Sequence, residues 1–190
     1  MLSHHLAIVS ETPAADLRGV TFAAAAIQRQ VLQDFGPLWA IDATVSAFAS
    51  LDDVPVGYWP VIVETDIETP GAAGIHEDKG GQPFALIEYS NTWSLTASHE
   101  VLEMLADPWG RRVHAGQSVK PGQGRVEFLV EVCDPCETAE VGYHVNWPAR
   151  VRLHHAELLR SGRESCWPVQ LHRRDHGAPS GPRRRLPELA

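Results

Sequence analysis

One helix constrains the fold of this chain more than any other feature of the sequence. The segment Ser98–Gly110 reads SHEVLEMLADPWG, and its apolar residues have the spacing of a helix, which we expect from about Ser94 to Ala106, before Pro108. At about 100° per residue, apolar side chains fill one arc of this helix and charged side chains share the other. The charged residues are His99, Glu100, Glu103 and Asp107. Such a helix packs its apolar arc on a core and leaves its charged arc for solvent or for a site.

The segments around this helix alternate between helical and strand-like patterns. Good helix formers dominate residues 20–36, and β-branched or alternating residues predict strands on both sides of the charged helix. The expected strands cover residues 41–48, 58–67 with an interruption at Pro60, 83–90 and 125–132. The Gly-rich stretch 71–82 predicts a loop. This order of elements predicts an α+β domain.

The composition argues against several classes of protein. A chain of 190 residues with 44% hydrophobic residues can bury one sizeable core. No apolar run approaches the roughly 20 residues of a membrane span, and the N-terminus lacks the basic region and the clear cleavage site of a signal peptide. We therefore expect a cytoplasmic protein without a membrane partner. The net charge of −8 argues against nucleic acid as a partner, and three cysteines define no disulfide framework.

The charge is distributed unevenly along the chain. Residues 147–190 hold nine arginines and four acids, whereas residues 1–146 hold seven basic residues and twenty acids. The later part also lacks a sustained strand period. We therefore expect a domain over residues 1–146, followed by a basic, disordered, Arg/His/Pro-rich tail over residues 147–190.

The charged arc of the helix has the spacing of a metal site. His99 and Glu103 lie one turn apart on the same face and can bind one cation, while the adjacent Glu100 can act as general base toward water. The segment from Ser94 to Ala106 contains no lysine or arginine that would neutralise the acids. Carboxylates repel one another at this spacing, and a cation relieves the repulsion.

The sequence HEVLE, residues 99–103, resembles the HExxH helix of the zincin metallopeptidases. The likeness covers roughly residues 20–146, because a helix and a run of strands precede the motif helix in the usual zincin order. The chain also looks similar to uncharacterised bacterial and phage proteins with a SHExxExxxDP pattern. The resemblance implies a zincin-like mixed sheet, a zinc-dependent hydrolase with Glu100 as catalytic base, and a peptide or protein substrate. Glu103 replaces the second histidine, and this carboxylate shifts the metal preference toward manganese or calcium.

A third metal ligand is required, and the sequence offers candidates in two places. Asp107 lies two turns from His99, where the chain can turn its carboxylate inward before Pro108, or can use it to bond nearby backbone. The segment EVCDPCE follows a strand and supplies three more acids, Glu131, Asp134 and Glu137. We place Asp107 first and Asp134 second, although Asp-Pro is also common in ordinary turns.

Two other interpretations compete with a hydrolase. A non-catalytic protein, for example a phage-derived structural component, would use the same acidic cluster to bind a stabilising cation. An acidic binding module would present the charged arc as a solvated face. Cys133 and Cys136 form a CxxC that no second motif completes, and His76 lies in the expected loop, where it contacts either substrate or solvent.

The basic tail has the composition of a G+C-rich gene read out of frame. Codons for Trp147 onward can, after a shift of one base, read GPRVSDFITPNYFDPVASRAGPYSFTGA, which has the alternation and the aromatic residues of an ordinary protein. Its VSDF and aromatic stretch resembles the proteins with the SHExxExxxDP pattern. We therefore predict a frameshift near Asn146.

Overall fold

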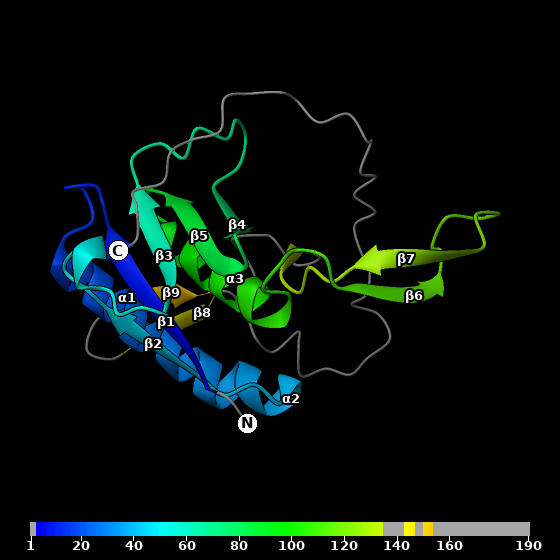
Figure 1. The fold of residues 1–190 in the computed structure, drawn as a ribbon, viewed down its shortest axis with the longest axis horizontal. Helices are drawn as coiled ribbons and strands as arrows, with labels where there is room; N and C mark the ends of the chain where they lie inside the picture. The colour runs from blue at the N-terminus through cyan, green and yellow to red at the C-terminus, as the bar shows by residue number, and fades with distance from the viewer. Residues whose placement is uncertain (1–2, 135–142, 147–149, 154–190) are drawn as a thin grey trace.

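The computed structural model describes residues 3–134, 143–146 and 150–153. A five-stranded mixed sheet with the strand order β2-β1-β3-β5-β4 forms its centre (Figure 1). The first four strands in this order are parallel, and the edge strand β4 runs antiparallel to β5. The strands span His4–Ser10 (β1), Ala43–Ala47 (β2), Trp59–Glu64 (β3), Gly74–Lys79 (β4) and Gln82–Glu88 (β5). The fold is therefore α+β, as the order of the sequence patterns predicted.

The helix near the N-terminus, α1, spans Leu17–Gln30 and connects the parallel strands β1 and β2. The Asp16 carboxylate begins this helix by accepting a hydrogen bond from the Gly19 N–H at 2.8 Å. The helix continues through a π-helical turn, Val31–Phe35, and the short helix α2, Gly36–Trp39. Its small buried alanines allow the helix to pack closely on the sheet.

Strand β1 is absent from the predicted order of elements, although it lies between β2 and β3 in the sheet. Its residues Leu6 to Val9 are completely buried, because both faces of the sheet are covered at this position. A central strand of this kind is a short continuous apolar run without alternation, and such a run is easily mistaken for an apolar patch. The expected interruption of β3 at Pro60 is also wrong, since β3 begins at Trp59 and passes through Pro60.

The prediction of a loop over residues 71–82 is wrong, because Gly74–Lys79 form the edge strand β4. This strand pairs with β5 through the two-residue turn Gly80-Gly81, in which both residues have positive φ. An edge strand carries polar and charged residues, so its hydrophobic pattern is weak.

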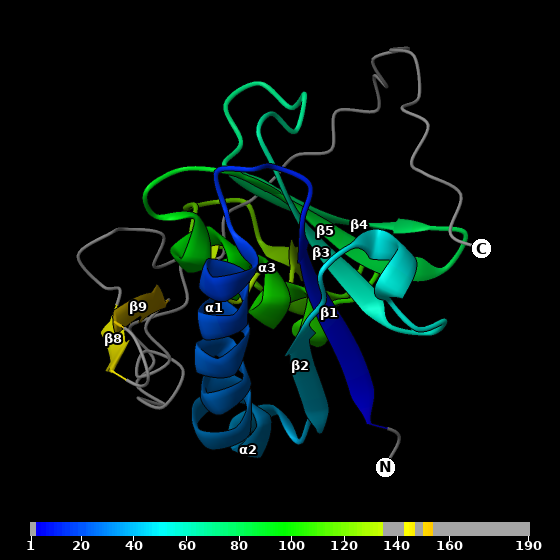
Figure 2. The same cartoon turned by 90° about the vertical axis from the view of Figure 1, so that its left-hand side faces the viewer.

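The helix with the charged arc is α3, Trp93–Ala106, and the prediction of this element is confirmed. It follows β5 directly and packs with α1 on one face of the sheet, where their apolar residues form the main core (Figure 2). Asp107 ends the helix with a non-helical backbone (φ −139°, ψ 77°), and the residue before a proline disfavours the helical conformation. A smaller apolar group covers the opposite face and comprises Ile62, Ile67, Phe84 and Leu86.

The described residues beyond α3 include two antiparallel pairs of strands. Strands β6, Val113–Gln117, and β7, Arg125–Leu129, project away from the sheet (Figure 1). Strands β8, Tyr143–Asn146, and β9, Arg150–Leu153, pair with each other, and β9 lies against α3 and α1. The expected domain boundary at residue 146 thus falls between two paired strands. The remainder of the expected tail lies outside the described residues. In the part of the chain that is described, no helix is long and apolar enough to cross a membrane.

Candidate metal centre

The charged arc of α3 is buried. His99, Glu100 and Glu103 are 7%, 6% and 4% exposed, because this arc faces strand β4 and the segment that follows β7. An acidic binding module requires a solvated face at this position, and that face is absent from α3. The arrangement brings histidine and carboxylate side chains together out of water.

The first group of potential ligands comprises His99, Glu103 and Asp134, and we call it the His99 group. The atom His99 Nε2 lies 3.2 Å from Glu103 Oε2 and 3.3 Å from Asp134 Oδ1. The other carboxylate oxygen, Glu103 Oε1, accepts a hydrogen bond from the Cys133 N–H at 3.0 Å, which orients the side chain. One imidazole and two carboxylates are a donor set that suits zinc or manganese.

The second group comprises His76, Glu100 and Glu103, and we call it the His76 group. The atom His76 Nδ1 lies 3.4 Å from Glu100 Oε2 and 3.9 Å from Glu103 Oε2. On the other side of the ring, His76 Nε2 lies 3.2 Å from the Asp107 carbonyl oxygen. A carbonyl oxygen only accepts hydrogen bonds, so Nε2 carries a proton and donates it to Asp107. The two groups share Glu103.

Strand β4 packs directly on α3 at Gly74. A Cβ atom at this position would lie 2.6 Å from Thr96 Cγ2 and 2.8 Å from Glu100 Oε1. Both distances are shorter than real contacts of a Cβ atom. The absence of a side chain at Gly74 therefore allows the Glu100 carboxylate to occupy its position beside His76.

Asp107, the first choice for the third ligand, lies outside both groups. Its Oδ2 accepts a hydrogen bond from the Arg112 N–H, so the carboxylate stabilises the turn after α3. The structure instead brings the second choice, Asp134, to His99. Glu137 and Cys136 lie outside the described residues, and Cys133 is buried with its thiol donating to the His99 carbonyl at 3.7 Å.

The two histidines bind protons more tightly than usual in this cluster. Burial lowers the pKa of His99, but hydrogen bonds to Asp134 and Glu103 outweigh burial and raise it well above its ordinary value. Burial also lowers the pKa of His76, and the hydrogen bond to Glu100 together with nearby carboxylates gives a net increase. Protonated histidines thus partly compensate the acids when no cation is bound.

Two carboxyl groups also have raised pKa values, and here burial is the main cause. Burial raises the pKa of Glu100, and the hydrogen bond from His76 opposes this increase only in part. Burial, followed by the charge of Glu103, raises the pKa of Glu131 to about 7. The atom Glu131 Oε2 is buried and has no hydrogen-bond partner among the described residues. The surroundings of Glu100 and Glu131 therefore do not fully stabilise the charged form of these carboxylates.

His76 is the ligand candidate that the sequence interpretation undervalued. Its signal was the Gly80-Gly81 pair directly before the strand-like run of β5, because a Gly-Gly pair is typical of a tight hairpin turn. In that hairpin His76 pairs with Ala85 of β5, one strand away from the start of α3. A hairpin assignment would have placed His76 beside the charged helix rather than in a solvated loop.

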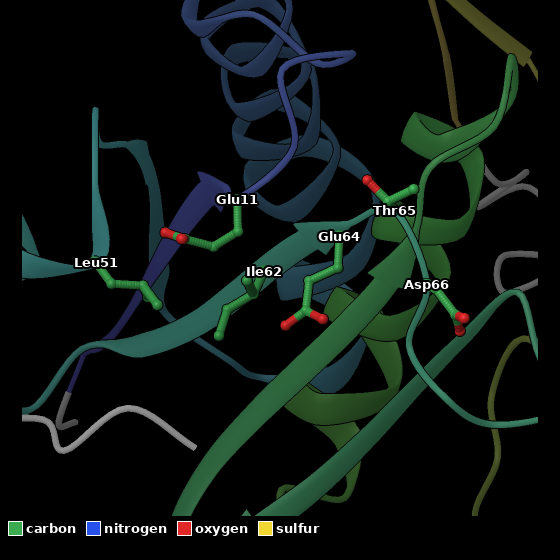
Figure 3. Close-up of a pocket in the computed structure, with 6 residues that line it drawn as sticks. All are labelled: Glu11, Leu51, Ile62, Glu64, Thr65 and Asp66. Carbon is green, nitrogen blue, oxygen red and sulfur yellow. The ribbon is translucent and has the colours of Figure 1, made fainter. Parts of the chain in front are cut away.

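A separate hollow of about 400 Å³ lies at the carboxyl ends of β1 and β3 (Figure 3). Its lining includes Ile62, which belongs to the apolar group on the face of the sheet opposite α3. The other lining residues are Glu11, Leu51, Glu64, Thr65 and Asp66. None of them belongs to the His99 or the His76 group, so the hollow is distinct from the candidate metal centre.

Comparisons with known proteins do not place the chain in a family. No family model, no curated protein and no solved structure matches it. The function is therefore inferred from the geometry of the candidate metal centre and from the sequence of α3.

Proposed function

We propose that the protein is a metal-dependent hydrolase of the zincin type and that the His99 group holds its divalent cation. One observation carries this proposal: His99, Glu103 and Asp134 place three ligand atoms within 4.8 Å of one another in a buried site, with the Glu100 carboxylate on the same arc of α3. The ion pairs described for Glu100 and Glu103 involve only His76 and His99. Buried carboxylates are costly unless they are paired or coordinate a cation.

The cation and Glu100 would have different roles in hydrolysis. A divalent cation supplies Lewis-acid chemistry, because it polarises a carbonyl group and lowers the pKa of water to about 7. Glu100 accepts the proton from the attacking water and delivers it to the leaving amine. Burial raises the pKa of Glu100, and this brings its affinity for a proton closer to neutral pH, where transfer in both directions is efficient.

A peptide is the substrate class that the sheet favours. Strand β4 is the last strand in the sheet order and pairs with β5, and no other strand among the described residues pairs with its outer edge. An extended peptide can pair with such an edge through backbone hydrogen bonds. The side chain of His76 extends from β4 into the ligand cluster, so a peptide on this edge would pass close to Glu100.

The order of elements supports the zincin assignment. A mixed sheet precedes the motif helix, and α3 follows β5 directly with His99, Glu100 and Glu103 on its buried arc. Zinc is the metal that the resemblance implies. The carboxylates of Glu103 and Asp134 make manganese and calcium the alternatives.

The substitution Glu100→Gln tests this proposal. The variant removes the general base but leaves the His99 group intact, so we expect this group to bind zinc with unchanged affinity and peptide hydrolysis to fall at least about a hundredfold. Zinc binding is measured by titration calorimetry, and hydrolysis with a fluorescent library of unstructured peptides. The matched control is Glu127→Gln, which changes an exposed carboxylate on β7 and leaves both properties unchanged. Full hydrolysis by the Glu100→Gln protein would overturn the assignment of the base.

A second candidate is a non-catalytic protein that the cation only stabilises. The observation in its favour is the depth of the site, because His99, Glu100 and Glu103 are each less than a tenth exposed and a substrate has little direct access. The same experiment separates the two functions. For the non-catalytic protein, neither the parent chain nor Glu100→Gln hydrolyses any peptide, although both bind the metal.

A further inference from the structure

We infer that the cluster holds a second divalent cation, bound by the His76 group. We also infer that this cation inhibits hydrolysis because it binds the Glu100 carboxylate. The inference rests on the proposed function, in which the first cation binds the His99 group. The second site is formed by His76 Nδ1 and by carboxylate oxygens of Glu100 and Glu103, all within 4.8 Å of one another.

The orientation of His76 is that of a metal ligand. Its Nε2–H donates to the Asp107 carbonyl oxygen, and its Nδ1 lies beside the two carboxylates. Metal-binding histidines use one nitrogen as ligand and commonly donate the other N–H to a carbonyl or carboxylate, which fixes the tautomer and the ring. The Asp107 carbonyl, at the end of α3, thus directs His76 Nδ1 toward Glu100, where this nitrogen can bind a cation once it has lost its proton.

Glu103 is placed to serve both sites. Its Oε1 is held by the Cys133 N–H, while Oε2 lies 3.2 Å from His99 Nε2 and 3.9 Å from His76 Nδ1. One carboxylate oxygen therefore lies between the two imidazoles. Metal ions that share a carboxylate in this way are about 3.5–4 Å apart in two-metal enzymes.

The charges of the cluster match two divalent cations. When both histidines are neutral ligands, Glu100, Glu103 and Asp134 contribute three negative charges, so one divalent cation leaves an excess. Glu131 adds a fourth carboxylate, whose Oε2 is buried without a hydrogen-bond partner among the described residues. The cationic side chain of Arg112 is directed elsewhere, since it donates to the Ala106 carbonyl and lies over the Trp39 ring.

The second cation has a direct consequence for the reaction. A Glu100 carboxylate that binds a cation is a much weaker base toward water, so a cation in the His76 group opposes the role of Glu100 as general base. Activity should therefore rise as the first equivalent of metal binds and fall as the second binds. His76 is absent from the His99 group, and its removal should abolish the inhibition at excess metal.

The test is a titration of chelator-treated full-length protein with Mn²⁺, followed by calorimetry and by electron paramagnetic resonance. We expect two bound equivalents and, at saturation, the broadened spectrum of two coupled ions instead of the six-line signal of isolated Mn²⁺. The variant His76→Gln should bind one equivalent and show the isolated signal. The control His114→Gln changes an exposed histidine on β6 and should bind two.

Each outcome decides a different part of the inference. One equivalent with an isolated signal in the parent protein overturns the second site and leaves the proposed function intact. No bound Mn²⁺ and no bound Zn²⁺ overturns both. Two coupled ions in His76→Gln would show that His76 is not a ligand and would also overturn the second site. The coupled spectrum of the parent protein needs no variant, so the inference stays testable even when His76→Gln does not fold.

Discussion

The substitution Glu131→Gln should make the metal-free protein less sensitive to pH. Glu131 is half-buried beside the ligand cluster, and burial raises its pKa from the ordinary 4.5 to about 7. Between these values the folded protein holds a proton on Glu131 that the unfolded chain has released. The free energy of unfolding therefore falls as the pH rises from 4.5 to 7, and this contribution is constant above pH 7. Glutamine cannot ionise and removes the effect.

The size of the effect follows from the shift and from the exposure of the side chain. A pKa of about 7 instead of 4.5 corresponds to roughly 3–4 kcal/mol, because a tenfold change in proton affinity is worth about 1.4 kcal/mol. Because Glu131 is only half-buried, solvent screening reduces this figure, and we expect about 1–2 kcal/mol. Relative to the parent protein, Glu131→Gln should gain this amount of stability between pH 4.5 and pH 8.

The assay is urea denaturation in the presence of a chelator at pH 4.5, 6 and 8, with the free energy of unfolding taken from the midpoint and the slope. Burial lowers the pKa of His99, but hydrogen bonds to Asp134 and Glu103 raise it overall, and burial raises the pKa of Glu100, so the stability of both proteins should fall with rising pH. The difference between the proteins isolates Glu131. The exposed Glu127→Gln is the control and should follow the parent protein. An identical pH dependence for Glu131→Gln and the parent would refute the electrostatic reasoning.

Three further predictions concern the ligands, the contact with β4 and the tail. Asp134→Asn should weaken zinc binding at least about tenfold by calorimetry, whereas Asp107→Asn should leave the affinity unchanged, because Asp107 bonds the Arg112 N–H; the reverse result would restore Asp107 as ligand. Gly74→Ala should lower the free energy of unfolding by about 1–3 kcal/mol, since its Cβ would overlap Thr96 and Glu100; equal denaturation midpoints would contradict this. Resequencing of the gene should reveal a shift of frame near Asn146, and codons that cannot encode the shifted string would exclude it.

The sequence predicted the elements whose residues follow a clear period. The α3 helix and the helix that became α1 were expected because helix formers or helical spacing mark them, and strand β5 was expected from its short apolar run. The central strand β1 was missed, since burial on both faces removes the alternation that identifies a strand. The edge strand β4 was missed for the opposite reason, because its exposed residues are charged.

In the candidate site, too, the residues set by local spacing were predictable and the residues set by long-range packing were not. His99, Glu100 and Glu103 share an arc because helical geometry alone decides their spacing, and this was predictable. Whether the arc faced solvent or protein depended on long-range packing of β4 and of the segment after β7, which no local pattern encodes. The contacts of His76 and Asp134 with α3 also depend on long-range packing, because both residues are distant from α3 in the sequence.

The binding of a divalent cation by the purified protein is the most direct test of the account. Elemental analysis should find at least one equivalent of zinc, manganese or calcium, and a chelator should lower the melting temperature. Restoring the metal should raise the melting temperature again, because binding to the folded state stabilises it. In His99→Ala both the metal content and this thermal shift should fall. Protein that carries no divalent metal and whose melting temperature does not respond to any of the three cations would contradict the central claim.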